Sequence, residues 1–225
     1  MMLFPGGIEA PANATLVLSV AAATIYGFVL EMPPSWRRSA VKVLAVALLA
    51  VLATMSAGPW MLVAGLAASA AGDAFLSRKG EAAFLAGLAS FLAAHLFYIA
   101  LFSLEGAAAA PFLHDVARAV VVIAMALGAL GMVALLWPLV GSRQRFPVLI
   151  YAAAIFVMWL AALTLNSLPI LVGAVLFMIS DGLLATERFM LDETSRHRGW
   201  MRVAVWLTYY TAQLLIALAY VLKAA

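Results

Sequence analysis

The sequence predicts an all-α fold, a polytopic membrane bundle of eight transmembrane helices that forms a single integral membrane domain over residues 1–225. Composition, segment length and loop charge support this prediction. Of the 225 residues, 67% are hydrophobic and only 10% are charged, whereas soluble domains carry about 25% charged residues. The apolar segments are roughly 20 residues long, the length of a membrane-spanning helix, and not the roughly 10-residue strands of an outer-membrane barrel.

Eight apolar segments follow one another along the chain, and proline and glycine residues separate them. The Pro33-Pro34 pair follows the first segment, while Pro147 and Pro169 mark the breaks before the sixth and seventh. Each segment is expected to be a helix, because lipid requires a segment to satisfy its own backbone. Short loops make consecutive helices antiparallel neighbours. The expected spans are residues 13–31, 39–55, 59–76, 82–103, 116–138, 147–165, 168–186 and 200–222.

Basic residues concentrate in alternate loops, and this pattern predicts the orientation. One side holds Arg118 and Lys223 alone. Cytoplasmic loops carry the excess of Lys and Arg, so both termini are expected on the non-cytoplasmic side, in the inner membrane of a bacterium. The loops after the first, third, fifth and seventh spans hold the other basic residues: Arg37, Arg38, Lys42, Arg78, Lys79, Arg143, Arg145, Arg188, Arg196, Arg198 and Arg202.

Small residues lie on one face of the third span, at Gly65, Ser69 and Gly72. Small side chains at this spacing let two helix backbones approach closely in lipid. The two acids inside the spans are each preceded by a glycine eight residues earlier, Gly65 in the third span and Gly173 in the seventh. Both acids are therefore expected at similar depth near the cytoplasmic face.

Several function classes receive no support from the sequence. The chain has no cysteine, which excludes disulfides and thiolate metal sites. Two Asp and one membrane His are the minimum for a carboxylate-rich site, and no HExxH motif accompanies them, so no metal and no cofactor are expected. The basic residues are spread over short loops, so no nucleic acid partner is expected. No Gly-rich phosphate loop and no G-x-S-x-G motif occur.

Few ionisable side chains fall inside the predicted spans. Each costs at least a few kcal/mol there unless it faces protein or water, so each is a candidate for a functional or a structural role. The ionisable residues are Lys42, Asp73, His95 and Asp181, and the uncharged polar ones are Tyr98, Tyr151, Asn166, Ser180, Tyr209, Tyr210 and Gln213.

The two acids each allow a structural and a functional interpretation. Asp73 lies about one turn before the basic loop 77–80, so it either pairs with Arg78 or Lys79 of that loop or acts as a working carboxylate. An acid at a helix C-terminus is unfavourable to the helix dipole. Asp181 interrupts an otherwise apolar span, and it either forms a salt bridge or takes part in chemistry. Lys42 and Arg188 are the candidate partners of that salt bridge.

The remaining polar residues also leave two interpretations open. Lys42 either snorkels to the interface or faces the bundle, where it could pair with an Asp or bind a phosphate. His95 and Tyr98 are three residues apart and share one helical face. They are expected at the depth of Tyr209 and Gln213. Tyr209, Tyr210 and Gln213 either form an interhelical hydrogen-bond set or have a functional role.

Four segments, in this order, resemble the YhhN family: GDAFL (72–76), FLAGLASFLAAHLFYIALF (84–102), GAVLFMISDGLLATERF (173–189) and YYTAQLLI (209–216). The resemblance spans most of the chain, and Lys42 resembles the lysine of the family's second span. That family includes the membrane lysoplasmalogenases. The resemblance therefore implies a hydrolase of the vinyl-ether bond of lysoplasmalogens (alkenyl-glycerophosphocholine or -ethanolamine), which releases a fatty aldehyde and a glycerophospho-base. It implies a lysophospholipid substrate and membrane lipids as partners.

These residue types suit that chemistry. Vinyl ethers hydrolyse by rate-limiting protonation of the carbon β to oxygen, and water then traps the resulting oxocarbenium ion. Two carboxylates in different environments can divide the roles of acid and base, as in glycosidases. Asp73 and Asp181 are the catalytic candidates, with either as the acid, and Lys42 would set their charge or hold the substrate phosphate. The residues expected to bind or orient substrate or water are His95, Tyr98, Ser180, Tyr209 and Gln213.

Two other functions use the same residues. One is a hydrolase of another lysolipid, and the other is a transporter of small molecules, coupled to protons. A transporter needs polar side chains through both halves of the membrane, whereas the sequence places them mainly in the cytoplasmic half. At a rise of about 1.5 Å per residue, His95 is expected roughly 10 Å further from the cytoplasm than Asp73, so contact between them would require a tilt.

Overall fold

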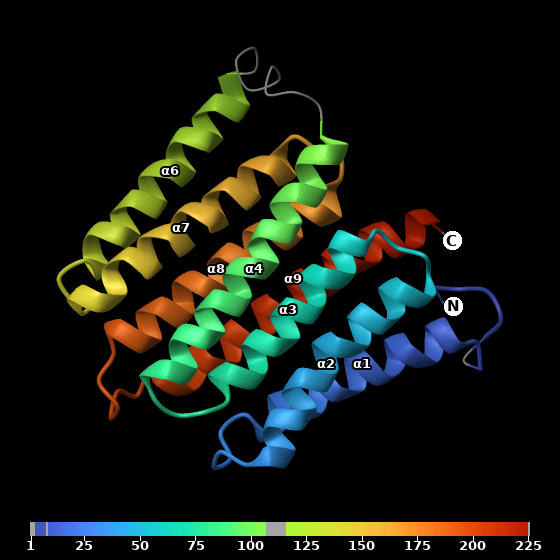
Figure 1. Cartoon of the computed structure of the whole chain (residues 1–225), viewed down its shortest axis with the longest axis horizontal. Coiled ribbons are helices and arrows are strands. Elements are labelled where there is room, and N and C mark those ends of the chain that lie inside the picture. Colours follow the sequence, from blue (N-terminus) through green and yellow to red (C-terminus); the bar gives the residue numbers. More distant parts are fainter. Residues whose placement is uncertain (1–2, 8, 107–115, 225) are drawn as a thin grey trace.

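The computed structural model describes residues 3–7, 9–106 and 116–224, and these residues form eight helices with no strand among them. The helices run side by side as one bundle (Figure 1), which confirms the all-α prediction. The Arg118 side chain, one of the two basic groups expected at the non-cytoplasmic end, lies outside the described part. The helices are α1 (Pro11–Val29), α2 (Trp36–Met55), α3 (Trp60–Leu76), α4 (Glu81–Glu105), α6 (Val116–Leu136), α7 (Ser142–Leu163), α8 (Leu168–Phe189) and α9 (Arg198–Ala224).

Seven of these helices are long and apolar enough to cross a membrane, and the protein is therefore an integral, multi-pass membrane protein. The exception is α3, which is apolar but has 17 residues. At 1.5 Å per residue, α3 is about 26 Å long, a little less than the roughly 30 Å hydrocarbon core.

The predicted spans agree with the observed helices within a few residues at most ends. The break predicted at Pro147 is wrong, because α7 begins at Ser142 and contains this proline. Pro147 lies in the second turn, where its ring removes only one backbone hydrogen bond close to the helix N-terminus. Pro169 lies in the first turn of α8, where proline is well tolerated.

Neighbouring helices in the sequence are mostly neighbours in space. The pairs α1–α2, α2–α3, α3–α4 and α8–α9 pack together, α9 also packs on α2, and α4 packs on α7. Helix α6 lies at one edge of the bundle (Figure 1), where it packs on α7 and α8. The four basic loops gather at one end, and both chain termini lie at the opposite end (Figure 1).

Glycines allow close approach where α3 meets α4 and where α8 meets α9. A Cβ at Gly65 would lie 2.8 Å from the Tyr98 ring, and one at Gly72 would lie 2.6 Å from the Phe91 ring. A Cβ at Gly173 would lie 2.8 Å from the side chain of Ile216 in α9. The close packing predicted for the small residues of the third span is confirmed.

Candidate active site

Asp73, near the basic end of α3, is buried and paired with a cation. Its side chain is 1% exposed, and Lys42 Nζ of α2 lies 2.9 Å from Oδ1. The Tyr209 hydroxyl of α9 donates to Oδ2 at 2.8 Å. An ammonium and a phenol on its two oxygens stabilise this carboxyl group as an anion. The alternative of a pair with Arg78 or Lys79 is wrong, since Lys42 turns into the bundle and takes that place.

Asp181 of α8 has different partners. The Tyr151 hydroxyl of α7 donates to Oδ2 at 3.0 Å, and His95 Nε2 of α4 lies 3.4 Å from the same oxygen. The structural alternative, a salt bridge to Lys42 or Arg188, is wrong: among the described residues, the group of basic type beside this carboxyl is the imidazole. The carboxyl group of Asp181 therefore has a phenol and an imidazole beside it, where Asp73 has a phenol and an ammonium.

The hydrogen bonds of His95 show where a proton must lie. Nδ1 is 2.6 Å from the backbone carbonyl oxygen of Phe91, and a carbonyl only accepts, so Nδ1 carries a hydrogen. The neutral ring then presents a bare Nε2 to the oxygen of Asp181. Two acceptors do not bond, so favourable contact requires one additional proton on Nε2 or on Asp181. Nε2 has no hydrogen-bond partner in the described part of the chain, and Asp181 Oδ2 at 3.4 Å is the carboxylate oxygen beside it.

Aromatic rings pack against the partners of the two carboxyl groups. The Phe177 ring lies 4.6 Å from the His95 ring and 5.6 Å from the Tyr209 ring, measured between centroids. Phe91 packs edge-on against Tyr209 at 5.6 Å. These phenylalanines are not recognisable from the sequence, because an aromatic residue in an apolar span carries no sign of a site. Tyr151 is conspicuous in the sequence as a polar residue, but nothing there places it in the site.

Tyr98 and Gln213 form a second polar group that joins three helices. The Tyr98 hydroxyl donates to Gln213 Oε1 at 2.6 Å, and Gln213 Nε2 donates to Ser69 Oγ at 2.8 Å. The sequence allowed an interhelical set of Tyr209, Tyr210 and Gln213. Each of them bonds to another helix, but with separate partners: Gln213 with Tyr98 and Ser69, Tyr209 with Asp73, and Tyr210 with Ser19. Ser180 also joins helices, since its hydroxyl donates to the Val205 carbonyl of α9 at 3.1 Å.

One cavity contains both carboxyl groups. It has a volume of about 540 Å³, opens at the basic end of the bundle, and is lined by Asp73, Asp181 and the aromatic residues Phe91 and Tyr209. Within residues 3–7, 9–106 and 116–224, no three His, Asp or Glu side chains cluster as metal ligands would. The basic residues that line the cavity are Arg38, Lys42, Arg78, Lys79, Arg188, Arg198 and Arg202.

Three of these basic residues are paired with an acid. Arg202 Nε lies 2.8 Å from Glu187 Oε1, and Arg198 Nε lies 3.4 Å from the same oxygen. Lys42 is paired with Asp73. The positive charge of the cavity mouth therefore exceeds the charge needed to balance its acids.

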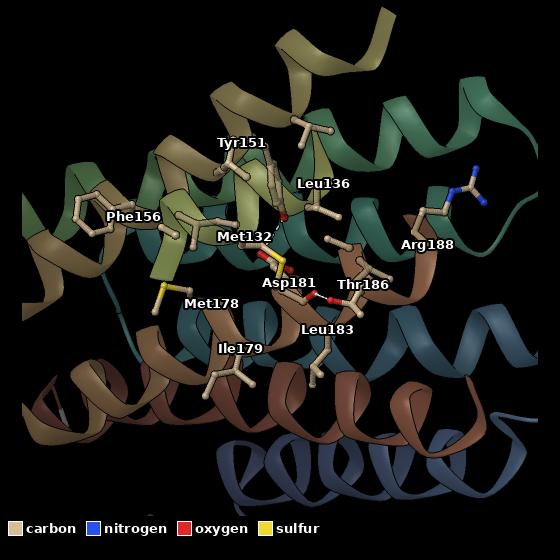
Figure 2. A pocket seen from close by; sticks show the side chains of 18 of the residues that line it. Met132, Leu136, Tyr151, Phe156, Met178, Ile179, Asp181, Leu183, Thr186 and Arg188 are labelled. Atoms are coloured by element: carbon tan, nitrogen blue, oxygen red, sulfur yellow. Dashed lines mark hydrogen bonds between the residues drawn. The ribbon is translucent and has the colours of Figure 1, made fainter. Parts of the chain in front are cut away.

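A second, apolar cavity of about 400 Å³ lies beside the first, between α4, α6, α7 and α8 (Figure 2). Asp181 lines both cavities. In Figure 2, Tyr151 points toward Asp181, and Met132 of α6 faces them. The candidate site thus has a charged mouth, two carboxyl groups in unlike surroundings, and an apolar chamber that begins at one of them.

The chain is similar to known proteins of one family. The model of the YhhN family matches residues 37–220. A protein of Mycobacterium tuberculosis named "Lysoplasmalogenase" is 35% identical over 160 residues, which is 69% of this chain and 58% of that relative. The human protein "Lysoplasmalogenase TMEM86A" is 30% identical over 240 residues, 97% of this chain and 93% of the relative. A mouse relative, "Lysoplasmalogenase TMEM86B", is 30% identical over 208 residues, 89% of this chain and 83% of the relative.

The chain spans less than two thirds of the length of the mycobacterial relative, but nearly the whole of the human one. No solved structure matches it. The family match covers α2 to α9 with every carboxyl, imidazole and ammonium group of the candidate site. This chain belongs to the YhhN family.

Proposed function

We propose that this protein hydrolyses the vinyl-ether bond of lysoplasmalogens, releasing a fatty aldehyde and a glycerophospho-base. The observation that carries the proposal is the single cavity in which Asp73 and Asp181 have unlike partners. The names of the curated relatives supply the substrate class. Alkenyl-glycerophosphocholine and alkenyl-glycerophosphoethanolamine are both within that class.

The partners of the two carboxyl groups support a division of roles. Asp181 faces the His95 imidazole and the Tyr151 hydroxyl and, among the described residues, has no ammonium or guanidinium beside it, so we assign Asp181 as the general acid that protonates the vinyl carbon β to the ether oxygen. Asp73 is the anion, balanced by Lys42, and it stabilises the oxocarbenium ion and accepts a proton from the attacking water. Pairs of carboxyl groups in unlike environments divide acid and anion roles in this manner.

The reaction balances with water as the only co-reactant. Protonation of the β carbon breaks the carbon–carbon π bond and leaves positive charge on the other vinyl carbon and the ether oxygen. Water adds to that carbon and loses a proton to Asp73, which gives a hemiacetal. The hemiacetal then breaks its carbon–oxygen bond to the glycerol, with transfer of the hydroxyl proton to the departing oxygen. The proton on Asp73 returns to Asp181 through solvent in the open cavity.

The cavity mouth suits a phosphate headgroup. Arginine binds phosphate through paired N–H groups, and Arg38, Arg78 and Arg188 line the mouth without a carboxylate partner among the described residues. Lys42 is paired with Asp73. Of the two roles considered for this lysine, we therefore assign it that of setting the charge of Asp73 and not that of binding phosphate. The headgroup would therefore lie at the basic end, with the vinyl ether at the carboxyl groups.

The same proposal includes the topology. All eight helices cross the membrane, α3 included, because 17 residues is within the range of known spans. The basic end is cytoplasmic, both termini are non-cytoplasmic, and the chain is one domain of a bacterial inner membrane. The basic loops gather at one end of the bundle (Figure 1), and this supports the orientation.

The test is aldehyde release from lysoplasmalogen by the protein purified in detergent. Asp73→Asn and Asp181→Asn are each expected to lower the rate by about 100-fold or more, since a positioned acid or base contributes that much. Asp192→Asn, in the exposed loop before α9, is the matched control and is expected to keep the rate. Normal activity in both cavity variants would refute the carboxylate mechanism. No aldehyde from any lysoplasmalogen would favour another lysolipid or a transported molecule as the substrate.

A further inference from the structure

We propose that the apolar cavity beside Asp181 holds the hydrocarbon chain of the substrate, and that α6 determines which chain lengths are accepted. The inference rests on the proposed function and identifies a part of the site that the family name does not specify. The lining of this cavity is apolar except at Tyr151, Asp181, Thr186 and Arg188. A cavity of this composition, within a membrane protein, favours a hydrocarbon occupant.

The position of the cavity identifies its occupant as part of an amphiphile. The apolar cavity and the charged cavity share six residues in their linings, with Arg188 toward the basic end: Leu76, Phe84, Phe91, Asp181, Leu184 and Arg188. A bond held at Asp181 therefore has cationic side chains on one side and an apolar chamber on the other. In a lysoplasmalogen, the vinyl ether lies between the glycerophosphate and the hydrocarbon chain, and so it matches this order of charged mouth, carboxyl group and apolar chamber.

The direction of the chain follows from the labelled side chains. Phe156 and Met178 lie on one side of Asp181 in Figure 2, and Arg188 lies on the other. Arg188 is near the basic end of α8. The chain would therefore run from Asp181 past Met178, along α6 toward its first residues and the middle of the membrane.

Three residues of α6 mark successive depths in the cavity. Met132 is level with Asp181, because a Cβ on Gly182 would lie 3.7 Å from Met132 Cε. Gly128 and Ala124 also line the cavity and precede Met132 by one and two turns. At 1.5 Å per residue, these positions are about 6 and 12 Å deeper than Met132.

The edge position of α6 gives a lipid chain a lateral path. Helix α6 packs on α7 and α8, but in the described part it has no close packing with α4, which lines the facing wall of the cavity. A single-chain lipid in the bilayer could enter between α4 and α6 without leaving the hydrocarbon region. A double-chain lipid would need room for a second chain beside the first.

Gly128→Phe tests the inference. No atom lies within 4 Å of a Cβ built at Gly128, so the new ring can enter the cavity without displacing the backbone. Each buried methylene changes affinity roughly fourfold, so the ratio of kcat/KM for a 16-carbon over an 8-carbon alkenyl chain is expected to fall about tenfold or more. Ala124 lies one turn deeper, so Ala124→Phe is expected to exclude only chains that are longer than the shortest chain excluded by Gly128→Phe. Gly131→Phe is the control, because Gly131 also has open surroundings but lies outside the cavity lining.

A binding measurement separates this inference from the proposed function. Saturated alkyl-ether lysolipids of the same chain lengths cannot be hydrolysed by the vinyl-ether route, and their binding is measured by displacement of a fluorescent alkyl-ether lysolipid. Gly128→Phe or Ala124→Phe should shift the binding preference toward shorter hydrocarbon chains, and Gly131→Phe should not. That result supports binding of the hydrocarbon chain in the apolar cavity even if no aldehyde is formed. Identical chain-length profiles in the wild type and all three variants, or no binding to the wild type, overturn it, whether or not hydrolysis occurs.

Discussion

Lys42 is the residue that distinguishes the two carboxyl groups of the cavity. It places an ammonium 2.9 Å from Asp73, whereas the described groups beside Asp181 are an imidazole and a phenol. Loss of the cation would leave a buried carboxyl group with the Tyr209 hydroxyl but without a balancing charge. Such groups either destabilise the fold or take up a proton, and in both cases Asp73 would stop serving as the anion of the reaction.

Lys42→Met is therefore expected to lower both stability and activity. Removing one partner of a buried ion pair costs about 3–5 kcal/mol, which thermal unfolding in detergent would register as a lower Tm. Adding Asp73→Asn to Lys42→Met should recover stability without recovering aldehyde release. Lys223→Met breaks an exposed pair with Glu105, 3.7 Å apart, and should change neither quantity. A double variant as unstable as Lys42→Met would contradict a direct pair.

Tyr151→Phe tests the surroundings of Asp181. The change removes the hydrogen bond of 3.0 Å to Oδ2, and a bond to a charged group contributes about 1.5–3 kcal/mol. Since the charge of Asp181 develops during proton transfer, kcat should fall about ten- to a hundredfold with KM nearly unchanged. Tyr210→Phe is the matched control, because Tyr210 contacts Ser19 at 2.8 Å and neither carboxyl group. Equal kcat in both variants would remove Tyr151 from the site.

The sequence identifies the ionisable members of the site but not their partners. Lys42, Asp73, His95 and Asp181 are conspicuous because ionisable groups are rare in apolar spans. Pairing depends on the rotation and tilt of each helix, which apolar sequences with little periodicity leave undetermined. Asp73 therefore contacts Lys42 and not its neighbours in loop 77–80, and His95 contacts Asp181 and not Asp73.

Among the helices, α3 and α4 depend on glycine for their contact. A Cβ on Gly72 would lie 2.6 Å from the Phe91 ring, and that ring packs against Tyr209, which holds Asp73. Spacing of small residues predicted this contact, since it is visible in one segment alone. The apolar cavity was not predictable, because its lining comes from helices far apart in the sequence and from residues without polar atoms.

Gly72→Ala is expected to destabilise the protein by about 1–3 kcal/mol through overpacking. It should also reduce aldehyde release, because a displaced Phe91 moves the Tyr209 hydroxyl away from Asp73. Thermal unfolding and initial rates measure the two effects. Gly131→Ala on α6, where a Cβ meets no atom within 4 Å, is expected to leave both unchanged. A Gly72→Ala variant as stable as Gly131→Ala would show that the contact is loose.

At the scale of the whole molecule, the topology follows from the crossing of α3. The chain has no native cysteine, so a single introduced cysteine reports on which side of the membrane its position lies. Trp60→Cys at the start of α3 should react with a membrane-impermeant maleimide from outside the cell. Lys79→Cys, just after α3, should react only once the membrane is permeabilised, as should Arg196→Cys between α8 and α9. Labelling of Trp60→Cys and Lys79→Cys from the same side would contradict eight spans.

At the scale of the whole bundle, Asp181 joins two cavities. The charged cavity opens at the basic end, and the apolar cavity beside it continues past Asp181 to Ala124 and Phe156. Spans, small-residue contacts and ionisable residues could be predicted because each is a local property of the sequence. The order of the cavities could not, because it arises from the relative placement of α3, α4, α6, α7, α8 and α9.

The central claim is that Asp181 delivers a proton to carbon in the rate-limiting step. Single-turnover hydrolysis of lysoplasmalogen in H₂O and in D₂O tests it most directly. The account predicts a rate severalfold slower in D₂O, one deuterium on the aldehyde carbon next to the carbonyl, and loss of the turnover in Asp181→Asn. Equal rates in the two solvents, together with unimpaired turnover by Asp181→Asn, would contradict it.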